Sequence, residues 1–486
     1  MELTPFGLAF LPLCALALVQ PIWLLYLVLL AGVFGAATPL VIAGYGLPPQ
    51  VTPAALFLAY AALQFLLGTR FVAALPAWRT LEPFVLTASY ALVTALLVPR
   101  LFAGDFTVWP QKLTPPFDIP VPLGPSMSNV TQSSYLLIEG ALLVGAGLYL
   151  TRARIDFVHL LQGYLVCGYV VVAICVWQVV HKLTGLWYPE AFLYSNPGWV
   201  IFPGQTMGIV PRINGPFSEP AALAYYLSGT VFCCTWLMLR GHRNRLAAVL
   251  LPLAVLALIS STSTTGFAVL GAGGVGLVIY GMSRAPRRMA LRIFAFAVPA
   301  AVLAVVAALA VATLSEKIEE SVAMVMHQSL QKAEGESFAT RTGLDLDSLG
   351  VLFPSYGLGA GWGSVRASSL IPGLLANLGI FGCMLLLWFV VRLVRQVGRA
   401  RRLASTAGQL MVLDGASAVV IGNLTAAVLS APSLNAVDFY LMLGLLIACA
   451  ARVEYEATSR RAQARRLQLA PAPAAVPPVA DAAMGR

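Results

Sequence analysis

Charged residues are scarce in this sequence: Asp, Glu, Lys and Arg make up 10% of its 486 residues, whereas hydrophobic residues make up 59%. A soluble globular protein carries about 25% charged residues, so this chain cannot cover a water-facing surface. It must be surrounded by lipid, where only helices and closed barrels satisfy the backbone. Apolar runs such as Phe84–Val98 and Phe294–Thr313 favour helices, because barrel strands would alternate polar and apolar residues over about ten positions.

Metal-ligand motifs are also lacking. The 7 cysteines all lie in apolar runs, without metal-ligand spacing or a neighbouring histidine, so we interpret them as small apolar residues of helices. We therefore expect no metal and no cofactor. The net charge of +10 could suggest nucleic acid, but the basic residues follow a membrane pattern, so we expect no nucleic-acid partner. The N-terminal apolar segment has no preceding basic region, so we expect no cleavable signal peptide.

Hydropathy predicts an all-α, polytopic membrane protein with about 12 or 13 transmembrane helices, which form one domain over residues 1–452. The number is open because the first two apolar segments are short and can be one span plus a half-helix. The expected spans are 6–19, 22–43, 53–68, 83–102, 133–150, 157–180, 219–239, 246–262, 264–282, 291–314, 371–393, 409–430 and 436–451.

Arginine is distributed unevenly between the alternate loops. Of the 30 basic residues, 22 lie in one set of connections and all 22 are Arg, which predicts that this set is cytoplasmic. The set comprises the loops near 70–79, 152–156, 240–245, 284–292 and 392–402 and the tail from 452. We expect residues 453–486 to be a disordered cytoplasmic tail, because the part from Leu469 is rich in Ala and Pro and cannot form a core.

Three long loops fall on the other side of the membrane: 103–132, 181–218 and 315–370. The first is rich in Pro, and the second carries aromatic residues that suit the membrane interface. The third begins with an expected amphipathic helix, in which Ile318 and Val322 lie opposite Glu319. Such a helix is either a structural cover for the bundle or a mobile lid over a lipid-linked substrate.

The first candidate site is Arg212-Ile-Asn-Gly215-Pro-Phe217-Ser-Glu219-Pro220, where an outer loop meets a membrane helix. Ser218 is the expected N-cap, and Pro220 is tolerated in the first helical turn. Gly215 and the proline after it would make a turn that folds Arg212 towards the helix N-terminus. A free helix N-terminus beside an arginine suits phosphate or pyrophosphate.

The second candidate site extends from Arg341 through Gly357-Leu-Gly359-Ala-Gly361-Trp-Gly363 and Arg366 to Asn377-Leu-Gly379-Ile-Phe-Gly382. Glycines at alternate positions cannot form a stable helix, so we expect a tight turn whose N–H groups can approach a ligand. No Gly-Lys-Ser or Gly-Lys-Thr follows, which excludes a Walker loop. Each outer arginine alone could simply pair with a loop carboxylate, but the planar guanidinium also matches phosphate oxygens in pairs.

These motifs resemble those of the O-antigen ligase and Wzy-type polymerase superfamily. Arg212-x-x-Gly215-x-Phe217-x-x-Pro220 is similar to the family motif before a central helix. Arg341, the Pro354-x-x-Gly357-x-Gly359 turn and Asn377-x-Gly379-Ile-x-Gly382 follow in the family order. The hydroxyl-rich run Ser260–Gly266 resembles the corresponding turn between two helices. The similarity covers residues 200–395.

The resemblance implies a GT-C-like bundle in the bacterial inner membrane, which transfers oligosaccharide from an undecaprenyl-diphosphate carrier at the periplasmic face without a metal. It implies that Arg212 and Arg341 hold the diphosphate, with Arg366 as a third arginine. Fixed guanidinium groups would stabilise the charge that builds on the departing diphosphate. The expected partners are the undecaprenyl-diphosphate-linked oligosaccharide, membrane lipid, a chain-length regulator and the export machinery.

The general base is open. A sugar hydroxyl has to lose its proton to a carboxylate or histidine near the reacting carbon. Glu219 is the first candidate, although an acid there can merely complement the helix dipole. His327 is the second, and it can equally be a solvated residue of the surface helix. Ligases of the family carry a His-Asn type motif before the Gly-rich helix, which Ser368-Ser-Leu-Ile-Pro-Gly373 lacks, so a polymerase of exopolysaccharide or O-antigen repeats is favoured over a ligase.

Two acids, Glu139 and Asp438, lie near the outer ends of their spans. Acids in membrane segments are costly and often functional, although these two are close enough to the interface to be wetted. A lipid-linked sugar flippase is the alternative from another class of protein. It would show inverted repeats and ionisable residues at mid-depth. No repeat is visible and the polar residues gather at the outer face, which favours an enzyme.

Overall fold

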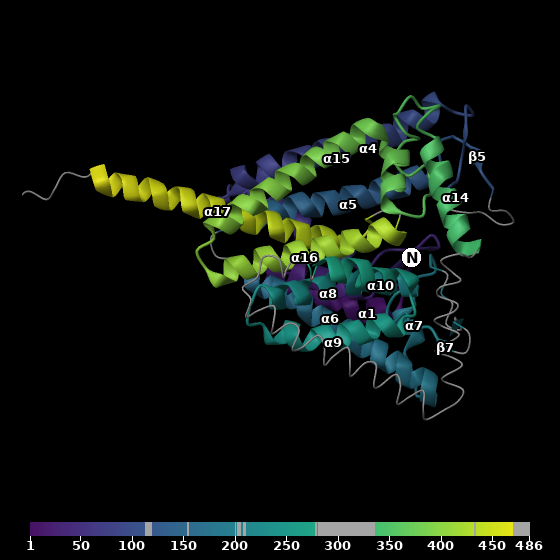
Figure 1. Cartoon of the computed structure of the whole chain (residues 1–486), viewed down its shortest axis with the longest axis horizontal. Helices are drawn as coiled ribbons and strands as arrows, with labels where there is room; N and C mark the ends of the chain where they lie inside the picture. The colour runs from purple at the N-terminus through teal and green to yellow at the C-terminus, as the bar shows by residue number, and fades with distance from the viewer. Residues whose placement is uncertain are drawn as a thin grey trace, which may run out of the picture.

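The computed structural model describes residues 1–111, 119–152, 155–199, 201, 206–207, 210–277, 279, 336–431 and 434–469. These residues form 14 α-helices and three very small sheets, which confirms the all-α class. Figure 1 shows the long helices side by side in one bundle, with β5, β7 and α14 at the same end. We call this end the loop end. The described parts of the three long loops predicted on the outer side belong to it.

The bounds of the elements follow from apolar runs that end at Gly, Pro or polar clusters. The helices are α1 (Pro5–Ala17), α2 (Ile22–Val33), α3 (Val51–Leu66), α4 (Ala74–Leu101), α5 (Met127–Tyr149), α6 (Phe157–Thr184), α7 (Glu190–Leu193), α8 (Pro220–Leu239), α9 (Arg245–Ser260), α10 (Thr264–Ala268) with a π-helix over Val269–Gly274, α14 (Glu336–Gly350), α15 (Leu370–Leu403), α16 (Ala407–Ser430) and α17 (Val437–Leu469). The antiparallel sheets are β1 (Glu2–Leu3), β2 (Leu40–Ile42) and β3 (Tyr45–Gly46); β4 (Thr107–Val108) and β5 (Val121–Pro122); and β6 (Thr206–Met207) and β7 (Val210–Pro211).

Helix length and hydropathy identify a multi-pass membrane protein. In the described part of the chain, 5 helices are long and apolar enough to cross a membrane, namely α4, α6, α8, α15 and α16. The first predicted span, 6–19, coincides with α1, which has 13 residues. The second, 22–43, is too long: α2 has 12 residues and ends at Val33, and Leu40–Ile42 form β2. At 1.5 Å per residue α1 and α2 are about 20 and 18 Å long, short of the roughly 30 Å hydrocarbon core. The predicted span 291–314 lies outside the described residues.

The centre of the bundle is α8, which packs most closely against α16. A methyl group on Gly422 of α16 would lie 2.6 Å from the carbonyl oxygen of Ser228, so only glycine permits this approach. Small residues commonly allow membrane helices to come this close. This contact holds the middle of α8, and the N-terminal end of the same helix belongs to the first candidate site.

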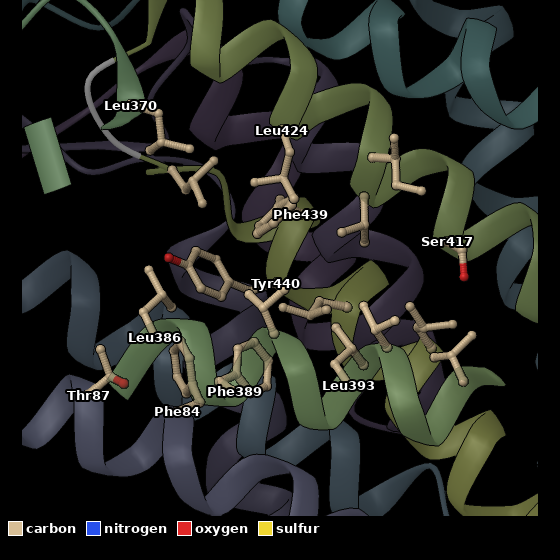
Figure 2. Close-up of a pocket in the computed structure, with 18 of the residues that line it drawn as sticks. Phe84, Thr87, Leu370, Leu386, Phe389, Leu393, Ser417, Leu424, Phe439 and Tyr440 are labelled. Carbon is tan, nitrogen blue, oxygen red and sulfur yellow. The ribbon is translucent and has the colours of Figure 1, made fainter. Parts of the chain in front are cut away.

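A cavity of about 720 Å³ lies between α4, α15, α16 and α17. Figure 2 shows its lining side chains, among them Phe84 of α4, Leu386 and Phe389 of α15, Leu424 of α16 and Phe439 of α17. These residues are apolar, so the cavity suits a hydrocarbon chain better than a polar ligand.

Ion pairs close the end of the bundle opposite the loop end. Asp414 of α16 is buried, and its carboxylate lies 2.8 Å from Arg401, 2.9 Å from His242 and 3.4 Å from Arg240. Arg401 also lines the cavity. One end of the apolar space is therefore formed by an arginine whose charge is compensated.

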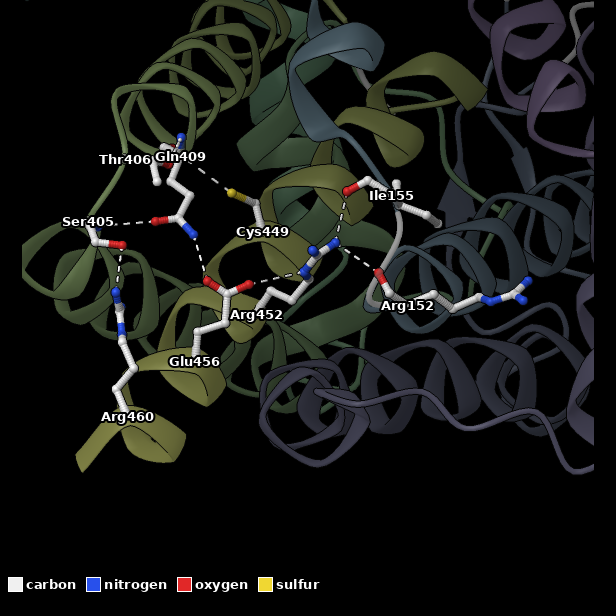
Figure 3. A network of polar contacts seen from close by, with 9 residues as sticks. All are labelled: Arg152, Ile155, Ser405, Thr406, Gln409, Cys449, Arg452, Glu456 and Arg460. Atoms are coloured by element: carbon white, nitrogen blue, oxygen red, sulfur yellow. Dashed lines mark hydrogen bonds and ion pairs between the residues drawn. The ribbon is translucent and has the colours of Figure 1, made fainter. Parts of the chain in front are cut away.

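The C-terminal helix is longer than we predicted. Residues 453–469, expected to be disordered, continue α17. Gln409 of α16 donates to Glu456 at 2.9 Å, and Arg460 donates to Ser405 at 2.8 Å, contacts that Figure 3 shows in one network. Arg399 of α15 pairs with Glu454 at 2.8 Å. These contacts hold the helix beyond the apolar run, while residues 470–486 lie outside the described residues.

Candidate functional site

The turn that carries Arg212 is fixed by polar side chains from two other helices. Gly215 has φ +56°, and its N–H donates to Oε1 of Gln178 in α6 at 2.8 Å. The N–H of Asn214 donates to the same oxygen at 3.1 Å. The Tyr194 hydroxyl, at the end of α7, donates to the carbonyl oxygen of Gly215 at 2.8 Å. The predicted turn at Gly215 is therefore present, and it is rigid.

Helix α8 starts one residue later than we expected. Its N-cap is Glu219, with φ −149° and ψ 159°, and Pro220 is the first helical residue. The prediction of Ser218 as N-cap was wrong, because a residue before proline is held in extended backbone and so takes the cap position itself. The Glu219 side chain forms no capping hydrogen bond, and the residue is exposed. Its carboxylate is therefore accessible at the loop end.

Arg212 has a buried donor without an acceptor in the described part of the chain. The side chain is half-buried, and its Nε has no hydrogen-bond partner there. Burial lowers the pKa of the Arg212 guanidinium, the nearby Glu219 carboxylate raises it, and the like charge of Arg341 lowers it. The two predicted arginines and the predicted acid thus interact electrostatically, although Arg341 is far away in the sequence.

Arg341 lies on α14, which two aspartates attach to the bundle. The Asp345 carboxylate accepts the N–H groups of Ser368 and Ser369, at 2.6 and 3.1 Å, at the start of α15. Asp347 accepts the indole N–H of Trp109 at 3.0 Å. The exposed Arg341 is therefore on a fixed helix rather than on a free loop.

The glycine-rich segment forms the predicted turn, and the amides of Gly357 and Gly359 bond within the protein. Gly357, Gly359 and Gly361 all have positive φ, between 76° and 88°. The N–H of Gly357 donates to Leu352 at 2.8 Å, and that of Gly359 donates to the Ser355 hydroxyl at 3.0 Å. These two amides are satisfied inside the protein, so we correct the expected role of Gly357 and Gly359 from ligand contact to close packing, while that of Gly361 stays a prediction.

The partner of this turn is a break in α15. Gly379 has φ 66° and ψ −174°, which interrupts the helix. The turn supplies replacement hydrogen bonds: Ile380 N–H donates to Gly357 at 2.8 Å, and Ala360 N–H donates to Ala376 at 2.7 Å. A methyl group on Gly359 would lie 2.7 Å from the Ala376 carbonyl oxygen. The glycine-rich turn, which follows α14 in the sequence, is therefore bonded directly to α15 at its break.

The remaining predicted residues have separate positions. The backbone N–H of Arg366 donates to the Trp109 carbonyl at 2.8 Å, which places Arg366 beside the β4–β5 hairpin. His327, the second candidate base, lies outside the described residues. Within the described ranges no group of three His, Cys, Asp or Glu side chains could hold a metal ion.

Sequence reasoning missed the residues that hold the site. Gln178 is a single polar residue in an apolar run, and Tyr194 is one of several aromatic residues in a long loop. Lys182 donates to the backbone carbonyl of Arg212 at 2.9 Å. The sequence carried one signal for them: a polar residue such as Gln178 that is buried in a membrane helix needs a polar partner.

Comparison with protein-family models finds no match, and comparison with curated proteins finds none either. The helices themselves define the class, a multi-pass α-helical membrane protein. The resemblance to the O-antigen ligase and Wzy-type superfamily rests on the motifs around Arg212 and Arg341 and stays a prediction.

Proposed function

We propose that this chain is a membrane glycosyltransferase that polymerises undecaprenyl-diphosphate-linked oligosaccharide repeat units into exopolysaccharide or O-antigen at the periplasmic face of the bacterial inner membrane. The observation that carries the proposal is the buried Nε of Arg212, which has no hydrogen-bond partner among the described residues and belongs to a guanidinium that interacts electrostatically with Arg341. Two like charges favour an anion between them, and the guanidinium fork matches phosphate oxygens.

In this proposal the two arginines stabilise the leaving group. The acceptor hydroxyl attacks the anomeric carbon of the carrier-linked sugar, and the bond from that carbon to the diphosphate oxygen breaks. The electron pair leaves with the carrier diphosphate, where fixed donors stabilise the developing charge without a metal. The hydroxyl proton passes to a base, for which the exposed Glu219 is the described candidate because it lies within electrostatic range of Arg212.

The cavity between α4, α15, α16 and α17 supports a lipid-linked substrate. Its lining is apolar over most of its length, with Leu370, the first residue of α15, at the loop end. An isoprenoid chain in this space would lie among the helices while its diphosphate remained at the loop end. The GT-C-like bundle, the 12 or so spans, the cytoplasmic tail and the regulator and export partners belong to the same proposal.

The test is transfer with full-length protein in detergent, given carrier-linked repeat units. We expect a ladder of longer carrier-linked glycans with the wild type. Arg212→Ala and Arg341→Ala should each lose transfer by about 10²-fold or more, the usual effect of removing a donor to a developing negative charge. Arg100→Ala is the control, because Arg100 is an exposed arginine at the end of α4 that bonds its own helix backbone.

Other outcomes assign other functions. A single transfer to a different acceptor would indicate a ligase. Movement of the carrier between leaflets without a new glycosidic bond would indicate a flippase. Wild-type turnover in Arg212→Ala or Arg341→Ala would remove the diphosphate role from that residue.

A further inference from the structure

Two buried acids lie at the same depth in the bundle. Glu139 of α5 is 3% exposed and Asp438 of α17 is 5% exposed. Both helices begin at the loop end and run the same way, and a methyl group on Gly444 of α17 would touch Ala146 and the backbone of Gly147 at 3.3 Å. This contact fixes the register of the two helices. Asp438 lies six residues before Gly444, and the turn that carries Glu139 lies about six residues before Ala146. Both acids are therefore about 9 Å closer to the loop end than the contact.

No basic side chain compensates these acids in the described part of the chain, where neither carboxylate has an ion-pair partner. The neighbours of the two acids on α2 and α4 carry no charge. A methyl group added to Gly32 of α2 would lie 3.1 Å from the Asp438 side chain, and Phe84 of α4 lies close to Gly140, the residue after Glu139. The titratable groups that interact electrostatically with the pair are Tyr135 of α5, Tyr164 and Cys167 of α6, Tyr225 and Tyr226 of α8, and Tyr440 of α17.

Two further polar groups near the pair lack a hydrogen bond of good geometry in the described residues. The Tyr225 hydroxyl is buried beside the Asn423 side chain of α16, and it interacts electrostatically with both acids. Asn423 is 1% exposed, and neither its amide nitrogen nor its oxygen has a well-aligned partner. Hydroxyl and amide groups without a well-aligned partner inside a protein are costly. The Tyr225 hydroxyl lies next to Asn423 and within electrostatic range of both acids.

Two carboxylates without a cation cannot both remain ionised in a low-dielectric interior. We propose that Glu139 and Asp438 form a proton-binding site, in which the pair holds one exchangeable proton. The Tyr225 hydroxyl lies within electrostatic range of both carboxylates. The proton comes from water: one carboxylate takes it from hydronium and becomes a neutral acid, and water is released. This inference does not depend on the proposed glycan transfer.

The site is connected to the turn that carries Arg212. Asp438 packs against Gly32 of α2. Just beyond the end of α2, a methyl group on Gly35 would lie 2.9 Å from the Phe217 ring, and Ala36 N–H donates to the Pro216 carbonyl at 3.2 Å. A change of charge at Asp438 therefore acts on a segment that directly supports the Arg212 motif.

The test is infrared difference spectroscopy of the full-length protein in lipid nanodiscs. At neutral pH the wild type should show a protonated-carboxyl C=O band that shifts in deuterated water. The substitutions Glu139→Gln and Asp438→Asn each replace one carboxyl group by an amide of nearly the same shape. In the double variant no carboxyl group of the pair remains, so the band should disappear. Glu82→Gln, which alters an acid that is paired with Arg392 at 3.1 Å, should leave the band unchanged.

The wild-type spectrum decides the proposal even if a variant fails to fold. Absence of a protonated-carboxyl band from about pH 5 to pH 9, above the ordinary range of carboxyl pKa values, would overturn it. A band that is present in choline chloride and vanishes in sodium chloride would also overturn it, because the pair would then bind a metal cation in preference to a proton.

Discussion

The turn before α8 depends on side chains that lie elsewhere in the sequence. Gln178, Tyr188 and Tyr194 converge on the backbone of Asn214 and Gly215. Arg212 and Glu219 could be selected from the sequence, because an arginine and an acid flank a glycine turn at a helix start. The supporting residues could not be selected from the sequence, because their contacts with the turn depend on how α6 and α7 pack against it.

Tyr194→Phe tests this support. The substitution removes a hydroxyl that donates to Gly215 at 2.8 Å and accepts from Gln178 at 2.9 Å, and it leaves the Gly215 carbonyl only the 3.4 Å contact from Tyr188. We expect a loss of about 1 kcal/mol of stability or more. Burial raises the pKa of Tyr194 to about 12, above the usual value near 10. Because the pKa of Tyr194 is higher in the folded state than in the unfolded state, the stability that the neutral hydroxyl contributes is present below about pH 10. It is lost as the pH rises from about 10 towards 12.

The measurement is the thermal unfolding midpoint of both proteins as a function of pH. The difference between them should be largest near neutral pH and should shrink above pH 10. Tyr356→Phe is the control, because Tyr356 is 87% exposed. An equal midpoint for Tyr194→Phe and wild type at neutral pH would show that the hydroxyl does not hold the turn.

At the scale of elements, hydropathy predicted the apolar helices well, because burial in lipid demands long apolar runs. It could not predict the short polar helix α14 or the break in α15, since both are stabilised by contacts with distant segments. Asn377 illustrates this: its side-chain oxygen accepts the N–H groups of Ser364 and Val365, both at 3.1 Å, and so binds the glycine-rich segment to α15.

Gly379→Ala tests the break in α15. A methyl group there would lie 2.4 Å from the Gly357 carbonyl oxygen, and the positive φ adds strain. We expect a loss of about 3 kcal/mol or more, from backbone strain and overpacking together. The measurement is unfolding of the detergent-solubilised protein by heat.

Gly398→Ala is the matched control on the same helix, because a methyl group at Gly398 would have open space around it. It should be neutral or slightly stabilising, as alanine is the better helix former. If both variants unfolded at the same temperature, the interruption at Gly379 would not require glycine.

At the scale of the whole molecule, the sequence predicted that the long loops share one side of the membrane, and the described parts of these loops lie at one end of the bundle. The resemblance implied that Arg212 and Arg341 share one ligand, and the two side chains do interact electrostatically. The attachment of α14 through Asp345 and Asp347 could not be predicted, because it depends on segments that are distant in the sequence. The cavity likewise follows from how α4, α15, α16 and α17 diverge, which no local pattern encodes.

Leu424→Trp tests the cavity as a lipid site. Leu424 lines the space, so a larger ring should displace a hydrocarbon chain and reduce co-purified isoprenoid lipid at least severalfold, as measured by mass spectrometry. Leu429→Trp is the control on the same helix, because Leu429 is 43% exposed and does not line the cavity. Equal lipid retention by both variants would exclude the cavity as the binding site.

The central claim is that Arg212 and Arg341 bind one diphosphate together. The most direct measurement is calorimetric binding of undecaprenyl diphosphate to the wild type, Arg212→Gln, Arg341→Gln and the double variant. We expect at least a tenfold loss of affinity in each single variant, and a loss in the double variant that is smaller than the sum of the two, since both residues hold the same group. Unchanged affinity in either single variant, or strictly additive losses, would contradict the claim.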